Sequence, residues 1–323
     1  MKSRAYSSLP LCLSMLTFAA LLIFPAEASA GARAGLSVCA AVIIPSLLPF
    51  IVLSSLLMEL GLPRGMAQLL APVTQRLFGV SGQAGAVFFL GLAGGYPLGA
   101  ITAAEMYADG YLEKKEAERL LGFCDNSGPA FIVAVAGSAI FGSHTLGFFL
   151  YFIHVFAAVS TGVVLRGKAT SVNSFSLENS TPPSFSQAFS VSVQKAAMAA
   201  VSISGFVVFF SVIMSLLNAS QLLPEFCGQL AYHLGLELHF THSLVGGIFE
   251  LGSGITSMAG LSLNAQNSAL AAFIIGWGGL SIQAQGAAVI KESGLSAAKH
   301  LSGKLLHGVL SALLTYILFP LFF

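Results

Sequence analysis

The 323-residue chain is 56% hydrophobic and only 8% charged, with a formal net charge of +1. About a quarter of the residues of an ordinary soluble domain are charged, so this composition, with a mean hydropathy of +0.86, indicates a polytopic integral membrane protein. A near-neutral chain without a clustered basic face gives no basis for nucleic-acid binding. The cysteines lie far apart and form no CxxC pair, so we expect neither a disulfide nor a metal site.

The N-terminal third begins with three apolar or amphipathic segments. Residues 1–30 combine a basic tip, an apolar run and a small-residue end, which is typical of a cleavable signal peptide and also of a retained first transmembrane helix. The next run, 34–60, is long enough to span a hydrocarbon core of ~30 Å, and we expect Pro45 and Pro49 to kink it. Residues 64–79 are too short and too charged to span, so we place them along the membrane interface.

Two apolar runs then follow that are interrupted near their centres. Residues 84–110 contain GLAGGYPLGAITA at 91–103, and residues 118–142 contain DNSGP at 125–129. Glycine and proline in a helix interior cost roughly 1 and 3 kcal/mol relative to alanine. We therefore expect a helical hairpin in the first run and a broken transmembrane helix in the second, followed by an unbroken span at 147–165.

The second part of the chain repeats this order of elements. Residues 167–187 are rich in Ser, Thr, Asn and Pro and predict a linker. After it come a span at 195–217, an amphipathic piece at 224–236, interrupted runs at 241–260 and 267–290, and a last span at 301–323. The repeated order indicates duplication, with one repeat at 31–166 and the other at 188–323.

The positions of Lys and Arg predict the orientation of the chain. Cytoplasmic loops carry an excess of these residues, and alternate crossing puts nearly all of them, Lys304 included, on or near the cytoplasmic side. The stretch 218–266 has no Lys or Arg, so we place it outside. This distribution requires each hairpin to return to its own side, so that each half crosses three times and the second half is inverted. We predict an all-α polytopic membrane protein, an inverted repeat of two halves that each hold a re-entrant hairpin and a broken transmembrane helix.

The four breaks form the candidate substrate site. Unpaired backbone groups cost several kcal/mol each in lipid, so broken backbone survives at membrane depth only where protein, water or ligand satisfies it. At any single break, close packing or a simple kink is the alternative explanation. The candidate substrate-binding residues are Gly95, Tyr96, Pro97, Gly99, Asn126, Ser127, Gly128, Pro129, Glu250, Ser253, Gly278, Ser281, Gln283 and Gln285.

Two further expectations concern how these breaks work. We expect Asn126 or Ser127 to cap a half-helix that begins at Pro129. Glu250 is an acidic residue within a membrane segment, which is usually functional, and we expect it to exchange a proton; the alternative is pairing with a donor such as His242 or a glutamine. We expect half-helix N-termini to hold an anionic ligand, because no Lys or Arg is expected at that depth. The histidines show no ligand spacing and are assigned no chemistry.

Several separated motifs carry a family resemblance. GLAGGYPLGA, GFCDNSGPAFIVAVAGS, FELGSGIT and GWGGLSIQAQ follow one another in this order, and with them the chain resembles the sporulation integral membrane protein YlbJ family, within the nucleoside-recognition (Gate) superfamily. The resemblance implies two Gate-like repeats similar to the core of concentrative nucleoside transporters. It also implies a secondary transporter that moves a small, anionic solute, with dipicolinate as the candidate. The implied location is the bacterial cell membrane or the membrane surrounding the forespore.

Other function classes stay open at this point. The chain could instead be a non-transporting membrane scaffold or sensor in spore assembly, or a nucleoside-type transporter. An intramembrane hydrolase would need more than Ser253 in GSG, and the sequence has no GxSxG elbow and no HExxH motif. We therefore predict no enzymatic activity, no catalytic residue and no cofactor. H+ or Na+ are the candidate coupling ions, and self-association into a homo-oligomer is compatible with the sequence.

The predicted topology can be tested by cysteine labelling. In a background that lacks the native cysteines, single cysteines at Ser174 and Gln229 should react with an impermeant thiol reagent from opposite sides of the membrane. The reason is the concentration of Lys and Arg near the first site and their absence around the second. Labelling of both positions from the same side would contradict the inverted repeat.

Overall fold

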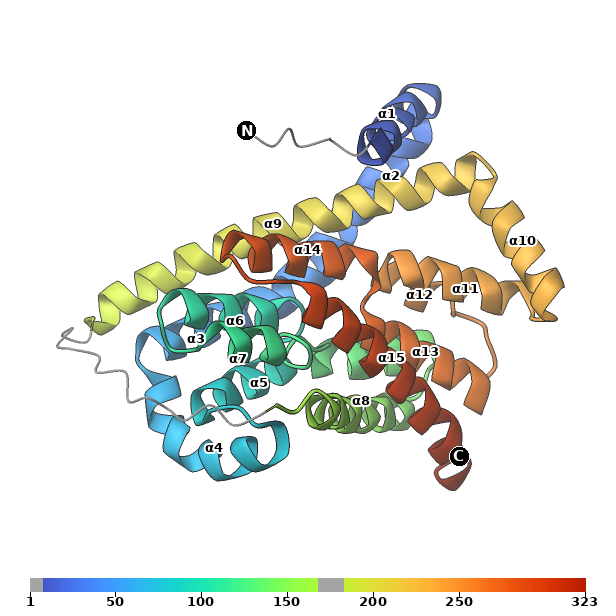
Figure 1. Cartoon of the computed structure of the whole chain (residues 1–323). Helices are drawn as coiled ribbons and strands as arrows, with labels where there is room; N and C mark the ends of the chain where they lie inside the picture. The colour runs from blue at the N-terminus through green and yellow to red at the C-terminus, as the bar shows by residue number, and fades with distance from the viewer. Residues whose placement is uncertain (1–7, 168–182) are drawn as a thin grey trace.

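A computed structural model describes residues 8–167 and 183–323 of the chain (Figure 1). Residues 168–182, most of the predicted linker, and the N-terminal tip lie outside the described residues. Every regular element in the described ranges is a helix. This confirms the all-α class.

The first helices differ from the predicted segments in their boundaries. Helix α1 (Ser8–Ile23) meets α2 (Pro25–Val38) at a bend of 103°. Helix α2 continues through a π-helical turn, η1 (Cys39–Ile43), into α3 (Ile44–Glu59). The helix that leads into the predicted second run therefore begins at Pro25 rather than at residue 34, and the boundary that we place between residues 30 and 31 falls inside α2. Proline suits the first helical turn, where its missing N–H has no partner to lose.

The rest of the first half follows the predicted order. The amphipathic piece is α4 (Leu62–Phe78), and the interrupted run forms α5 (Gly82–Gly94) and α6 (Leu98–Ala108), which pack against each other as a hairpin. The broken helix consists of α7 (Lys114–Leu120) and a π-helical segment, η2 (Ala130–Ile140), and α8 (His144–Val164) is the unbroken span.

The second half begins with the longest helix. Helix α9 (Phe185–Ala219) starts ten residues before the predicted span, and Ser184 and Gln187 form a capping box at its N-terminus. Its 35 residues give a length of about 52 Å at 1.5 Å per residue. The linker predicted over 167–187 thus ends before Phe185.

The remaining elements repeat the first half. They are α10 (Leu222–Leu234), the hairpin of α11 (Leu238–Phe249) and α12 (Leu251–Thr256), the broken helix of α13 (Ala265–Trp277) and α14 (Gly279–Glu292), α15 (Ala298–Leu318) and a final 3₁₀ turn, η3 (Phe319–Leu321).

The two halves contact each other through equivalent elements. The second arm of each hairpin packs against the second segment of the other half's broken helix, α6 against α14 and α12 against η2. Helices α2 and α3 likewise pack along α9, their counterpart (Figure 1). Reciprocal packing of this kind is what two related halves around a shared centre produce.

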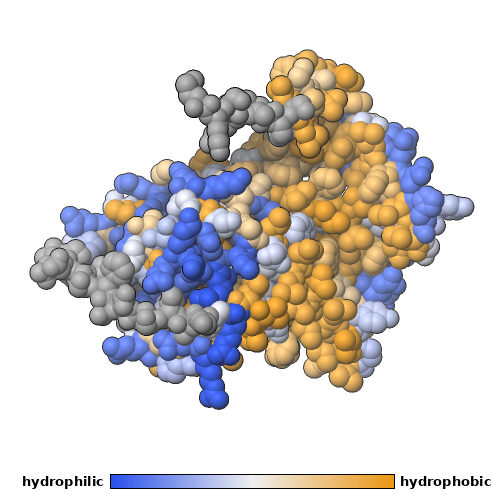
Figure 2. All heavy atoms as spheres, in the orientation of Figure 1, coloured by the Kyte–Doolittle hydropathy of each residue, from blue (hydrophilic) through white to orange (hydrophobic). Residues whose placement is uncertain are grey.

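The surface of the molecule fits a multi-pass membrane protein. Four helical segments in the described ranges are long and apolar enough to cross a membrane, and up to six are if each bent pair counts as one span. Figure 2 shows apolar side chains across the middle of the molecule and hydrophilic residues at two opposite ends, one over α6 and α7 and the other over α10. The protein is therefore an integral, multi-pass membrane protein.

Candidate functional site

A cavity of about 420 Å³ lies where the interruptions of both halves meet. The two hairpin tips, the break before η2 and the first turns of α14 all contribute to its wall. Helices α2, α3 and α9 close the remaining sides, mainly with apolar residues. The structure therefore brings the predicted interruptions of both halves together around one cavity.

Half of the candidate residues line the cavity. They are Gly95, Tyr96, Ser127, Gly128, Glu250, Ser281 and Gln285. The others lie behind this wall or beside it: Pro97, Gly99, Asn126, Pro129, Ser253, Gly278 and Gln283. A role of either group in substrate binding stays a prediction.

Glycines at the first hairpin allow close contact with the break in the neighbouring helix. A Cβ atom at Gly91 would lie 1.9 Å from the carbonyl oxygen of Cys124, and one at Gly99 would lie 2.1 Å from the same oxygen. Any larger residue would force the hairpin away from the broken helix. The Cys124 thiol also donates to the carbonyl oxygen of Gly99 at 3.4 Å. These glycines therefore serve packing between the two interrupted segments.

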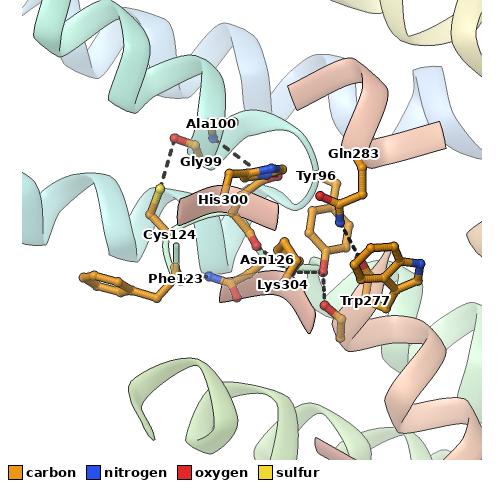
Figure 3. Close-up of polar contacts among 12 residues, drawn as sticks. Tyr96, Gly99, Ala100, Phe123, Cys124, Asn126, Trp277, Gln283, His300 and Lys304 are labelled. Carbon is orange, nitrogen blue, oxygen red and sulfur yellow. Dashed lines mark hydrogen bonds and ion pairs between the residues drawn. The ribbon is translucent and has the colours of Figure 1, made fainter. Parts of the chain in front are cut away.

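Helix α13 ends at Trp277 with Gly278 as its C-cap, and its last carbonyl groups accept hydrogen bonds from side chains outside the helix. Gly278 and Gly279 both have positive φ, 82° and 81°, so the chain turns sharply there. The Tyr96 hydroxyl lies 2.9 Å from the carbonyl oxygen of Ile275 and 3.2 Å from that of Gly276. The Gln283 amide donates to the Trp277 carbonyl at 2.7 Å (Figure 3). The polar ends of Tyr96 and Gln283 thus satisfy backbone, while the Tyr96 side chain also borders the cavity.

Glu250 caps the second half of its own hairpin. Its carboxylate accepts hydrogen bonds from the backbone N–H groups of Gly252, at 2.8 Å, and of Ser253, so Glu250 is the N-cap of α12. The partners are therefore backbone groups rather than His242 or a glutamine. The residue is 8% exposed and borders the cavity. Exchange of a proton by Glu250 stays a prediction.

The cap that we expect at DNSGP is wrong. The Asn126 side chain donates backward to the Phe123 carbonyl at 2.9 Å, and the backbone N–H of Ser127 donates to Nε2 of His154 at 3.0 Å. Neither side chain caps η2, whose N-cap is Pro129 without a side-chain hydrogen bond. The Asn126 amide is turned toward the preceding carbonyl, which leaves its Oδ1 atom without a partner, and the hydrogen bond of Ser127 to His154 uses its backbone N–H.

Our expectation that no cation lies at this depth is also wrong. Lys304 is fully buried in α15. Its ammonium donates to the Asp125 carbonyl at 2.8 Å and to the Tyr96 hydroxyl. Its place near the start of a predicted span suggested the interface. The missed signal is the spacing of His300, Lys304 and His307, which puts three polar residues on one face of α15.

The cavity itself offers hydrogen-bonding groups but no cationic side chain among its lining residues. The Ser281 hydroxyl is buried and has no hydrogen-bond partner within the described residues, and Gln285 adds an amide to the same wall. Glu250 is the charged residue of the lining. The site can therefore enclose a small ligand by apolar contact and orient it by a few polar groups.

Reciprocal hairpins and broken helices around a shared, partly open cavity define this chain as a multi-pass membrane protein with a central site. Residues 40–164 match the family model described as Gate, nucleoside recognition. The chain is 28% identical over 330 aligned residues to the sporulation integral membrane protein YlbJ of Bacillus subtilis, covering 94% of this chain and 81% of that protein. The predicted resemblance is thus confirmed. No solved structure matches the chain.

The capping role of Glu250 gives a stability prediction. Glu250→Gln keeps one acceptor oxygen but turns an amide NH₂ toward the second backbone N–H, so we expect a loss of about 1–2 kcal/mol of stability. Thermal or denaturant unfolding in detergent measures it. Glu237→Gln is the matched control, because Glu237 stands at the N-cap of α11 without a side-chain cap bond. Equal stability of the two variants would contradict the capping role.

Proposed function

We propose that this protein is a secondary transporter that moves a small anionic solute, with dipicolinate as the candidate, across a membrane during endospore formation. The observation that carries the proposal is the shared cavity between the halves, which both hairpin tips border together with residues beside both helix breaks. Secondary transporters place their substrate site between structural repeats and build it from discontinuous helices.

The relatives support the setting and the class of ligand. The similar Bacillus subtilis protein is named a sporulation integral membrane protein, and the family model over 40–164 is described as nucleoside recognition. The first name supports a role in spore formation. The second supports recognition of a small solute, so a nucleoside is the second candidate substrate.

The architecture also suggests how access to the site changes. Each hairpin tip contributes to the cavity wall, and each hairpin packs against a broken helix of the other half. Movement of one hairpin would open the cavity toward one side while the other hairpin keeps it closed. A scaffold or sensor would not need a central cavity shared by both repeats, which favours transport over that alternative.

Backbone N–H groups beside the cavity favour the binding of an anion. Ser281 lies in the first turn of α14 and borders the cavity. The first turn of a helix carries unpaired N–H groups and a partial positive charge, which favour anions by roughly 0.3–2 kcal/mol. The buried Lys304 adds a positive charge directly behind Tyr96. These groups support an anion despite the carboxylate of Glu250.

Uptake by purified protein in proteoliposomes tests the proposal. Labelled dipicolinate, other small carboxylates and nucleosides are compared, and we expect saturable uptake of dipicolinate. Ser281→Val removes the unpartnered hydroxyl and should raise KM about tenfold, which corresponds to ~1.4 kcal/mol, with little effect on folding. Ser302→Val, at an exposed position of α15, is the control. Absence of uptake for every compound would refute transport.

A further inference from the structure

A cluster of buried titratable residues adjoins the cavity on the side of α15. Its members come from three elements: Asp125 from the break before η2, His154 from α8, and His300, Lys304 and His307 from α15. None of the five is more than 1% exposed. Ionisable residues inside a membrane are costly and usually mark a pathway or a relay.

Contacts within the cluster centre on Asp125. One carboxylate oxygen, Oδ2, lies 3.2 Å from Nε2 of His300, and the other accepts the backbone N–H of Ala100 at 3.3 Å. The ammonium of Lys304 donates to the backbone carbonyl of the same aspartate at 2.8 Å. Because a carboxylate only accepts hydrogen bonds, Nε2 of His300 carries the proton and Nδ1 has the free lone pair.

The net charge of the cluster depends on whether His300 carries an added proton. With Lys304 protonated and His300 neutral, the ammonium of Lys304 and the carboxylate of Asp125 balance, and the cluster has no net charge. A proton that binds Nδ1 of His300 gives the cluster a net charge of +1 while the hydrogen bond from Nε2 to Asp125 is kept. An added positive charge close to the cavity would attract an anion there, since buried charges interact strongly at low dielectric.

The cluster also lies between water and the cavity. His300 belongs to the first turn of α15, and its neighbours Ser296 and Lys299 are exposed. At the other end, Lys304 donates to the hydroxyl of Tyr96, which borders the cavity. The cluster therefore has one end near the hydrated surface and the other at the candidate substrate site.

We infer that the pair formed by Asp125 and His300 binds the proton that is cotransported with the anion, with Lys304 as the balancing charge. This inference rests on the proposed transport function. The proton comes from water, binds Nδ1 of His300 and returns to water after the anion has left, so no other bond is made or broken. Glu250 is less suited to this role, because both of its carboxylate oxygens hold backbone N–H groups.

Helix α7, which packs against α15, carries charged side chains: the Glu118 carboxylate accepts the backbone N–H of Ser296 at 3.0 Å, and Arg119 donates to the Gly79 carbonyl at 2.9 Å. The remaining titratable groups near the pair make hydrogen bonds of their own. Nε2 of His154 accepts from Ser127, and Nε2 of His307 donates to the carbonyl of His154 at 3.1 Å. Tyr96 and Cys124 both hydrogen-bond to carbonyl oxygens. Helix α13, which packs along α15, has no titratable side chain. His300 differs from His307 in its contact with the Asp125 carboxylate, which would offset the positive charge of an added proton.

Two substitutions should distinguish proton binding from anion binding. Asp125→Asn leaves the Lys304 charge unbalanced, so the cluster keeps +1 without a proton and His300 has no counter-charge. Dipicolinate affinity should then stay high at neutral pH and lose its pH dependence. His300→Gln removes the proton acceptor and leaves the cluster neutral, so affinity at acidic pH should fall about tenfold, the equivalent of ~1.4 kcal/mol.

The measurement uses proteoliposomes loaded with the pH indicator pyranine. Addition of dipicolinate outside should acidify the lumen with the wild-type protein, while labelled dipicolinate reports uptake in parallel. Both variants should lose the acidification, and exchange of labelled for unlabelled dipicolinate should persist. His233→Gln, an exposed histidine of α10, should behave as wild type. Damage to folding alone would lower affinity in both variants, whereas the proton site predicts a lower affinity only in His300→Gln.

The outcomes separate this inference from the proposed function. Wild-type uptake of dipicolinate without acidification would overturn the proton site and leave transport standing. Acidification that persists in His300→Gln would do the same. Absence of dipicolinate uptake by the wild type would overturn the proposed function, and the inference with it.

Discussion

Backbone hydrogen bonding at the helix breaks is the constraint on which the rest of this structure depends. In a membrane there is no water to bond exposed N–H and C=O groups, so each broken helix must find partners within the protein. Glu250 supplies them to the start of α12, Tyr96 and Gln283 to the end of α13, and Trp277 to the carbonyl of Ile248 at 3.1 Å. The breaks are stable because long polar side chains reach them.

These partners mostly come from a different element, and often from the other half. Tyr96 at the tip of the first hairpin satisfies carbonyl groups of α13, and Lys304 of α15 satisfies the carbonyl of Asp125. Neither half can therefore complete its own interrupted helices. A movement of the first hairpin would free backbone groups in the second half, so the two halves are energetically coupled at the cavity.

The sequence was sufficient to locate the interruptions but not their partners. Glycine and proline have strong local effects, so GGYPLG and GWGG could be assigned to breaks from composition alone. The capping of η2 and the place of Lys304 depend instead on which side chains from distant segments reach a given backbone group. The spacing of His300, Lys304 and His307 puts them on one helix face, but the neighbouring helices decide whether that face meets the interior or the interface. The predicted boundaries of α2 and α9 were wrong for a related reason, because the two helices stabilise each other by packing along their length.

The need to satisfy backbone groups at the breaks also explains why Lys304 and Asp125 are buried in the centre of the molecule. A full charge buried for a backbone contact alone would be expensive, yet Lys304 and Asp125 are both completely buried. Each offsets the charge of the other, and each also bonds a backbone group that the break has exposed. The features that make the breaks stable thus place a balanced pair of charges beside the cavity. A proton taken up by His300 beside that pair would change the electrostatic field at the site.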